Sequence, residues 1–385
     1  MTDAAVVLSP LEIAAGVPLG MDPGTPDLKR VSRRDASPLR QLEKAVLPNL
    51  LRQPCLVSFS GGRDSSAVLA VAVSAARREG LDLPVPVSLR YVNAPETRED
   101  EWQELVIGAL GLKDWERITI RDELEFLGPA ATAMLQEFGV MYPMNQALFL
   151  QPILPRAHGG SLLTGWVGDW LFDTWQWRDA ADVVARRCKT RPRDLRRVAF
   201  AMAPRALRES RERRRQGRRF RWLSKEAQEA VDEIEMEERV REPVRWGDRL
   251  VWWVKLRRVQ MGPKAFQVMG AEYDIRWGHP LNDPDFLSHL GAASPATGLG
   301  DRTRAMRFLF SELLPDQLLS RPTKGFYGHA FWGSRTLDFA RGWDGEGVDT
   351  SVVDVVGLKQ EWSERLPNQR TASLLHQIWL AAHEG

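Results

Sequence analysis

Residues 55–79 limit what this chain can fold into more than any other segment, because an apolar run, a glycine turn and a helical pattern follow one another directly. The run Cys-Leu-Val-Ser-Phe at 55–59 predicts a short buried strand. The turn Ser-Gly-Gly-Arg-Asp occupies 60–64, and the Ala- and Val-rich stretch 65–79 predicts a helix that ends at Gly80. The segment is therefore expected to form a strand, a tight turn and a helix.

The same alternation continues through the first half of the chain. Further strands are predicted at 85–92, 115–120 and 160–164, and further helices at 38–51, 99–110 and 144–157. Strands that alternate with helices of this length predict an α/β fold with a doubly wound parallel sheet. Beyond Asp169 the pattern changes to helical stretches rich in Arg, Glu and Trp, which predicts a mainly helical second half.

The domain organisation follows from this change of pattern. We expect an irregular N-terminal segment at 1–37, rich in Pro, Gly and Asp, and then one domain at 38–385. Within that domain, 38–172 would form the α/β core and 173–385 the mainly helical part. With 385 residues, 43% of them hydrophobic, the chain is the size of an enzyme rather than of a small binding module.

Net charge and cysteine content indicate which partners and which cell compartment the sequence favours. A formal net charge of +2 gives no reason to expect nucleic acid or an anionic membrane as the main partner. Cys55 and Cys188 are far apart and form no disulfide framework, which favours the cytoplasm. The N-terminus carries Asp3 and Glu12 without a basic region, so it is a poor secretory signal, and no stretch is apolar for long enough to span a bilayer.

The glycine turn at 60–64 has a physical reason to bind phosphate. A strand that feeds a Gly-Gly turn into a helix presents backbone N–H groups and a helix N-terminus to an anion. The turn lacks the GxxxxGK[ST] pattern, whose lysine reaches the terminal phosphates of a nucleotide. A different nucleotide chemistry is indicated, although glycines also serve tight corners that bind nothing.

The order Ser-Gly-Gly-Arg-Asp-Ser-Ser at 60–66 resembles the SGGxDS loop of the PP-loop ATP pyrophosphatases, which include asparagine synthetases, β-lactam synthetase, GMP and NAD synthetases and several tRNA-modifying enzymes. The resemblance implies that this loop holds the departing pyrophosphate of ATP and that Asp64 binds Mg²⁺. The residues expected to contact the nucleotide are Ser58, Ser60, Gly61, Gly62, Asp64, Ser65, Ser66, Thr164, Gly165, Arg304, Arg307 and Arg321.

Further segments occur in the order expected for the synthetase domain of asparagine synthetases. Residues 163–172 resemble the second nucleotide-site segment of that family, which makes Asp169 the second Mg²⁺ ligand. Residues 278–284 are similar to a Pro-Leu-Asp segment, and 304–315 to a basic helix that ends in Leu-Pro. Residues 321–326 resemble the stretch that carries the active-site lysine, here Lys324. The resemblance covers roughly residues 38 to 340 as scattered motifs.

These residue types suit the adenylation of a carboxylate. The reaction places negative charge on the bridging oxygen and on the leaving pyrophosphate, so cationic and N–H groups are needed in a dry cleft. Mg²⁺ prefers oxygen ligands and takes one or two carboxylates beside phosphate oxygens, which suits Asp64 and Asp169. Lys324 would approach the α-phosphate and then the oxyanion of the acyl intermediate. Arg304, Arg307 and Arg321 are secondary candidates for the pyrophosphate.

The sequence departs from asparagine synthetases in two ways. It has Thr2 where the glutamine-using enzymes have a catalytic Cys, and about fifty residues before the loop are too few for a glutaminase domain. The amine is therefore expected to be free ammonia or an amino group on a substrate. Trp166 stands where asparagine synthetases have a Glu and β-lactam synthetase a Tyr, and an indole cannot act as a general base.

Lasso-peptide cyclases of the same superfamily often have Gly-Trp-Gly-Gly-Asp at this place and a similar lysine stretch. In this chain Val167 replaces one of those glycines, and Trp170 replaces the acidic residue that usually follows the Asp. The similarity favours an amide synthetase of a natural-product or peptide-modifying pathway. Its carboxylate and amine substrates would be small molecules, peptides or carrier-bound groups.

Two alternatives stay open. Residues 186–222 are densely basic and include Phe220 and Trp222, which could stack on bases, so a PP-loop tRNA-modifying enzyme is the second hypothesis. A solvated helical arm with Arg/Glu pairs is favoured over RNA binding, and an acidic leader peptide or carrier protein would fit as well. The third hypothesis is an inactive scaffold of the same fold, against which the intact Asp64, Asp169 and Lys324 argue. The sequence carries no signal for the oligomeric state.

Overall fold

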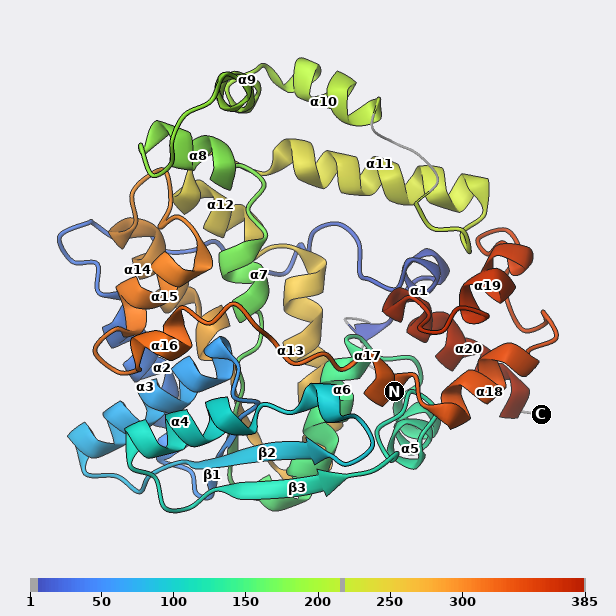
Figure 1. Ribbon diagram of the computed structural model, residues 1–385, viewed down its shortest axis with the longest axis horizontal. Helices are drawn as coiled ribbons and strands as arrows, with labels where there is room; N and C mark the ends of the chain where they lie inside the picture. The colour runs from blue at the N-terminus through green and yellow to red at the C-terminus, as the bar shows by residue number, and fades with distance from the viewer. Residues whose placement is uncertain (1–5, 215–218, 384–385) are drawn as a thin grey trace.

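A five-stranded parallel sheet forms the base of the computed structural model, which describes residues 6–214 and 219–383 (Figure 1). Its strands, in the order β3-β2-β1-β4-β5 across the sheet, are β3 Glu116–Ile120, β2 Val85–Tyr91, β1 Cys55–Ser58, β4 Ser161–Leu163 and β5 Arg276–Gly278. The chain thus runs outward from β1 to β3 and returns to the other side of β1. The fold is the α/β doubly wound sheet that the sequence predicts.

The connections of the sheet place a crevice beside β1. Cys55 pairs with Ser161 of β4, while Leu56 pairs with Val85 of β2, so β1 lies between strands that leave it in opposite directions. In open α/β sheets the ligand site lies outside the carboxyl ends of the strands, at the point where the strand order reverses. That point here is the gap between the loops that follow β1 and β4.

Helices of the first half pack beside the sheet. They are α2 Pro38–Leu50, α3 Arg63–Glu79, α4 Asp100–Leu110, α5 Pro129–Phe138 and α6 Met144–Leu150. The Ala- and Val-rich α3 is buried along most of its length, between β1 and its neighbours α2 and α4, which is why it carries small apolar residues. It ends at Gly80, whose φ of 65° forms a left-handed cap.

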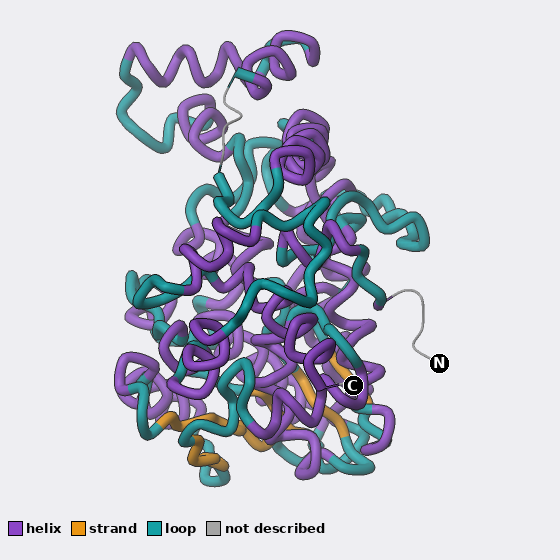
Figure 2. The backbone as a smooth tube through the Cα atoms, turned by 90° about the vertical axis from the view of Figure 1, so that its right-hand side faces the viewer, coloured by secondary structure: helices purple, strands orange, loops and turns teal. Residues whose placement is uncertain are grey.

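The second half is mainly helical, as predicted. Its helices are α7 Gly168–Asp173, α8 Arg178–Val184, α9 Pro192–Ala201, α10 Arg205–Arg213, α11 Lys225–Arg241, α12 Trp246–Trp253, α13 Arg257–Met269, α14 Pro284–Ala293, α15 Arg302–Phe310, α16 Asp316–Leu319, α17 Gly328–Phe331, α18 Ser334–Gly342, α19 Val355–Trp362 and α20 Ala372–His383. Short 3₁₀ segments are η2 Pro95–Thr97, η3 Gln151–Ala157, η4 Ala271–Tyr273, η5 Pro280–Asn282 and η6 Gln369–Thr371. Figures 1 and 2 show α9 and α10 on the outside of the molecule, at the end farthest from the sheet.

Three elements differ from the sequence-based expectation. The helix predicted at 144–157 divides into α6 and the 3₁₀ segment η3, because Pro152 has no N–H group to continue the α-helical pattern. β5 was not predicted, since a three-residue strand is too short to show a periodicity. The segment 1–37, expected to be irregular, contains α1 Pro10–Ala15, which begins with a capping box of Ser9 and Glu12.

No helix within the described residues is both long enough and apolar enough to cross a membrane. Both cysteines are free, Cys55 in the core and Cys188 at the surface.

His376 makes the core sensitive to acid. It lies in α20, is completely buried, and contacts the carbonyl oxygen of Phe126 through Nε2 at 2.8 Å. Burial lowers its pKa to about 4 from an ordinary value of 6.5. The unfolded chain therefore takes up a proton at this residue, between pH 6.5 and 4, that the folded chain does not.

We predict that His376→Gln flattens the pH dependence of stability, because glutamine keeps an N–H donor for Phe126 and does not titrate. Wild type should lose up to roughly 3 kcal/mol more of its free energy of unfolding than the variant between pH 6.5 and 4. Urea unfolding across this range measures the difference, with His158→Gln at the surface as the matched control. Parallel curves for wild type and His376→Gln would contradict the prediction.

Candidate active site

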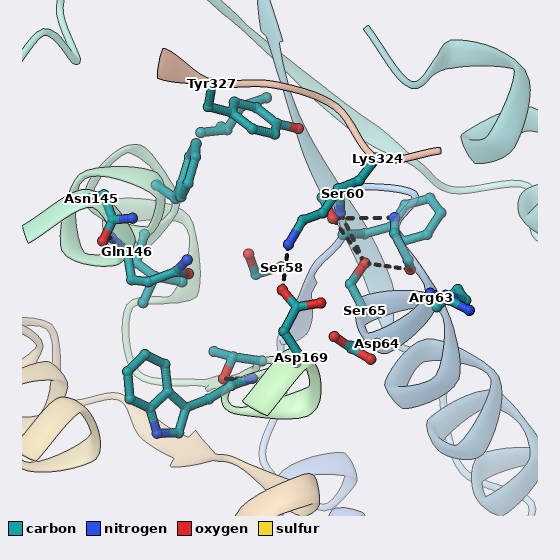
Figure 3. A pocket seen from close by; sticks show the side chains of 18 of the residues that line it. Ser58, Ser60, Arg63, Asp64, Ser65, Asn145, Gln146, Asp169, Lys324 and Tyr327 are labelled. Atoms are coloured by element: carbon teal, nitrogen blue, oxygen red, sulfur yellow. Dashed lines mark hydrogen bonds and ion pairs between the residues drawn. The ribbon is translucent and has the colours of Figure 1, made fainter. Parts of the chain in front are cut away.

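A cavity of about 460 Å³ lies at the carboxyl ends of β1 and β4. Its walls come from the loop after β1, the loop after β4, α6, and the segment 321–327 that follows α16. Figure 3 shows Asp64, Ser65 and Asp169 on one side of this space, Lys324 above them, and Asn145 and Gln146 across from them. The cavity thus occupies the crevice that the strand order creates.

The loop after β1 is held in shape by its own hydrogen bonds. The Ser60 N–H donates to Ser65 Oγ at 3.2 Å, and Ser65 Oγ donates in turn to the Gly62 carbonyl at 3.2 Å. Gly61 has a φ of 83°, and a Cβ there would lie 2.8 Å from Cγ of Gln103. The first glycine of the motif is therefore required by both backbone conformation and space.

Groups behind the loop hold it from outside. Gln103 Nε2 donates to the Ser60 carbonyl at 3.1 Å, and Arg321 Nη1 donates to the Gly61 carbonyl at 2.9 Å. Arg321 also forms a buried ion pair with Glu99 and stacks its guanidinium on Trp102. Arg321 therefore supports the loop after β1. It also lines the cavity, where the sequence predicts that it contacts the nucleotide.

The loop after β4 approaches the first loop so closely that only glycine fits at two positions. A Cβ at Gly165 would lie 2.9 Å from the backbone N of Ser65, and one at Gly168 would lie 2.2 Å from Cγ of Asp64. Between them, Val167 has a φ of 64°, a left-handed conformation that is strained for a β-branched residue. A glycine would adopt this conformation without that strain.

This contact brings the two predicted metal ligands together. Asp64 lies in the first turn of α3 and Asp169 in the first turn of α7, and both carboxylates point into the cavity (Figure 3). Lys324 pairs with Asp169. The three residues that the sequence assigns to catalysis are therefore brought to one place.

Arg302, which the sequence did not indicate, joins these carboxylates. Its Nη2 lies 2.7 Å from Oδ2 of Asp64, and its Nη1 pairs with Asp169 and lies 2.8 Å from Asp173. Burial acts to lower the pKa of Arg302, but the three aspartates outweigh it and raise that pKa above its usual value. The guanidinium is thus fixed in its charged form at the centre of the cluster.

The two aspartates respond differently to their surroundings. Burial raises the pKa of Asp64, because desolvation outweighs the attraction of Arg302. Burial also acts to raise the pKa of Asp169, but Lys324 and Arg302 outweigh it and hold that pKa below its usual range. Asp169 is therefore the more strongly ionised of the pair.

A second cation lies beside Arg302. Arg63, the variable residue of the Ser-Gly-Gly-Arg-Asp turn, lines the cavity, and burial together with the nearby Arg302 charge lowers its pKa. Two guanidinium groups beside the N-terminus of α3 are chemically suited to an anion. Arg304 and Arg307 do not join this pair: both are exposed on α15 outside the cavity wall, and Arg307 pairs with Asp316.

The remaining predicted residues divide between cavity and core. Ser58, Thr164 and Gly165 line the cavity, whereas Ser66 is completely buried beneath it and does not reach the wall. Thr164 Oγ1 lies 2.7 Å from Nδ1 of His279, whose pKa burial lowers to about 4. His279 is thus a neutral support for the wall rather than a proton donor.

Trp166 forms an apolar wall where related enzymes have a polar side chain. Its indole N–H donates to the Val259 carbonyl at 3.1 Å, and its ring packs edge-on against Trp170 and Phe266. Among the residues that line the cavity, Asp64 and Asp169 are the only carboxylates. The site therefore offers no additional carboxylate as a general base.

The far end of the cavity is aromatic. Tyr91, Phe149 and Tyr327 pack edge to face with centroids 5.0 to 6.3 Å apart. Burial raises the pKa of both tyrosines, so their hydroxyl groups are neutral. Asn145 and Gln146 of α6 project toward this space in Figure 3. None of these five residues was predicted, because they come from elements that carry no motif.

The basic segment 186–222 offers less to RNA than its sequence suggests. Trp222 is buried and its indole N–H donates to the Ala14 carbonyl, while Phe220 lies under the guanidinium groups of Arg219 and Arg370. Trp222 is therefore not available to stack on a base, and the two guanidinium groups already contact the Phe220 ring, which weakens the RNA-binding alternative. Part of the segment, 215–218, lies outside the described residues.

The carboxylates fit a magnesium ion that is completed by phosphate. Within the described residues no group of three or more His, Cys, Asp or Glu side chains is arranged to hold a metal. Asp64 Oδ1 is buried and has no hydrogen-bond partner, although it lies beside Asp169 in the cavity. An orphaned carboxylate oxygen and a second carboxylate match the one or two protein ligands that Mg²⁺ takes when a nucleotide supplies the rest.

The fold is a doubly wound α/β fold whose cavity lies at the glycine turn after the first strand, the arrangement of an α/β enzyme. Comparison with known protein families matches residues 39–360 to asparagine synthase. The match covers most of the chain, which therefore belongs to the asparagine synthase family and is in general terms an ATP-dependent amide-forming ligase. A search of curated proteins found no match.

We predict that Gly168→Ala weakens binding of Mg-ATP by about tenfold or more, because the new Cβ would displace the buried Asp64 carboxylate. Isothermal titration calorimetry measures the affinity. Gly108→Ala in α4 is the matched control, since a Cβ there meets nothing within 4 Å. Equal affinities in the two variants would show that the contact of the two loops does not shape the nucleotide site.

Proposed function

We propose that the chain is an amide synthetase that activates a carboxylate with ATP. The carboxylate oxygen attacks the α-phosphorus, the bond between that phosphorus and the bridging oxygen to the β-phosphate breaks, and pyrophosphate leaves. An amine then attacks the acyl carbon, loses a proton, and releases AMP as the amide forms. The observation that carries the proposal is the convergence of Asp64, Asp169 and Lys324 in one cavity from three distant segments.

Different residues of the cavity would carry out different parts of this reaction. The N–H groups of the loop 60–65, with Arg63, would bind the pyrophosphate unit. Bound Mg²⁺ would neutralise charge on the phosphates, and Asp64 and Asp169 would hold it. Lys324 is 67% exposed and is joined to the site by one contact, with Asp169. Its ammonium is therefore free to turn toward the α-phosphate and then toward the acyl oxyanion.

Away from the reacting groups, the substrate side of the cavity offers amides and indoles. A second cavity of about 370 Å³ adjoins the first and shares Asn145, Gln146, Trp166, Asp169 and Lys324 with it. Side-chain amides and indole rings suit the backbone and apolar groups of a peptide or a natural product that carries the reacting carboxylate. We therefore propose a natural-product or peptide-modifying pathway. The free cysteines support a cytoplasmic setting.

The alternatives receive less support. A tRNA-modifying enzyme would need exposed aromatic platforms or free base-reading groups beside its basic segment, and Phe220 and Trp222 do not provide them. An inactive scaffold would have no need for a buried cluster of aspartates and cations, which is costly unless it binds a ligand.

The products distinguish this proposal from other ATP-dependent ligases. We predict that turnover releases AMP and pyrophosphate, because the loop 60–65 would hold the two outer phosphates as one leaving unit. An ATP–pyrophosphate exchange screen over N-blocked peptides, free amino acids and aryl acids identifies the carboxylate, and ³¹P NMR then identifies the products. Formation of ADP and phosphate with the working substrate would refute the proposal.

Lys324→Met tests the assignment of the lysine, since it keeps the apolar stem and removes the cation. We predict a loss of roughly a hundredfold or more in rate, with Mg-ATP affinity within a few-fold of wild type. Lys44→Met, on an exposed lysine of α2, is the matched control. A Lys324→Met enzyme with near-normal turnover would show that another cation serves the α-phosphate.

A further inference from the structure

Arg302 holds both of the carboxylates that the proposed function assigns to magnesium. Its Nη2 contacts Asp64, and its Nη1 contacts Asp169 as well as Asp173. We propose that Arg302 is an internal substitute for the metal: it keeps the two aspartates together in the free enzyme and transfers to the triphosphate when Mg-ATP binds. The inference rests on the proposed function, because it takes the same two aspartates as the metal site.

The charges of the cluster explain why a cation must stand between these aspartates. Asp64, Asp169 and Asp173 bring three carboxylates, and Arg302, Lys324 and the nearby Arg63 bring three cations. The Asp64 and Arg302 side chains are only 14% and 10% exposed, so water screens their charges poorly. Without the guanidinium, the two carboxylates would repel each other and the contact between the loops after β1 and β4 would loosen.

Metal and guanidinium compete for this place. A dication bound by Asp64 and Asp169 would lie within a few ångströms of the Arg302 nitrogens, which touch the same carboxylates, and like charges at that distance repel strongly in a buried site. Binding of the metal to both aspartates therefore favours the departure of Arg302. The affinity for the bare metal is then reduced by the fraction of molecules in which Arg302 has already moved.

Two buried polar atoms of the cluster have no hydrogen-bond partner in the free enzyme. Asp64 Oδ1 and Arg302 Nε are both buried and have no hydrogen-bond partner. The first can only accept and the second can only donate, and the single contact between Arg302 Nη2 and Asp64 Oδ2 leaves both without a partner. A metal ion would satisfy Asp64 Oδ1, and a phosphate oxygen would satisfy Arg302 Nε–H.

The phosphates would also give Arg302 a nearby destination. Arg302 is the first residue of α15, and its charge acts on that of Arg63, which extends from the first turn of α3. In the free enzyme burial and the repulsion between these two guanidinium groups lower the pKa of Arg63, and Asp173, Asp64 and Asp169 offset this effect only in part. The triphosphate would lie against both, so Arg302 would exchange two carboxylates for phosphate oxygens at little displacement.

Binding of Mn²⁺ with and without ATP tests this exchange in the full-length protein. Titration followed by the electron paramagnetic resonance signal of free Mn²⁺ gives both affinities for wild type, Arg302→Ala and Arg302→Lys. Without nucleotide, Arg302→Ala should bind Mn²⁺ about tenfold more tightly than wild type. With saturating ATP the order should reverse, because the variant has lost a phosphate ligand.

Arg302→Lys keeps the charge but cannot bridge two carboxylates, so it should fall between wild type and Arg302→Ala in both titrations. If Arg302→Ala fails to fold, Arg302→Lys still tests the inference. Arg40→Ala, on an exposed arginine of α2, is the control and should match wild type.

The outcomes separate the inference from the proposed function. If wild type binds Mn²⁺ with ATP, but neither Arg302 variant binds bare Mn²⁺ more tightly, Arg302 is only a structural member of the cluster and the inference is overturned. Loss of affinity in both titrations would overturn it as well. If wild type binds no Mn²⁺ even with ATP, the proposed function fails and the inference with it.

Discussion

The close approach of the loops after β1 and β4 is the constraint on which the active site depends. Gly165 and Gly168 leave space for Ser65 and Asp64, so two aspartates on different helices face each other. Repulsion between them would open this contact, and Arg302 and Lys324 offset it. The doubly wound sheet supplies the place, because its strand order reverses between these two loops.

The rest of the cavity adapts this site to a reaction without an obvious base. Trp166 is fixed by its hydrogen bond to Val259 and closes the position where related enzymes have a Glu or a Tyr. The tyrosines at the far end are buried and neutral, and Asn145 and Gln146 contribute amides. In the proposed reaction such surroundings would position a substrate and exclude water, and the charged steps would take place at the aspartates and Lys324.

Motifs and apolar runs predicted the sheet through β4 and the family, and they singled out Asp64, Asp169 and Lys324, which the structure brings into one cavity, because each of these is encoded within a few consecutive residues. The sequence could not predict what depends on tertiary contact. Arg302 was passed over for Arg304 and Arg307, since a basic helix does not reveal which of its arginines faces the cavity. β5 was not predicted, because three residues are too few to show the alternation of a strand. The burial of Trp222 depends on its packing against Ala14, which is distant in the sequence.

A crystal structure with Mg²⁺ and a non-hydrolysable ATP analogue tests the central claim, that Asp64 and Asp169 form the metal site of an ATP-adenylating enzyme, most directly. The account predicts a magnesium ion about 2.1 Å from an oxygen of each aspartate, with the two outer phosphates on the loop 60–65. A triphosphate bound away from this loop, or a metal that contacts neither aspartate, would contradict it.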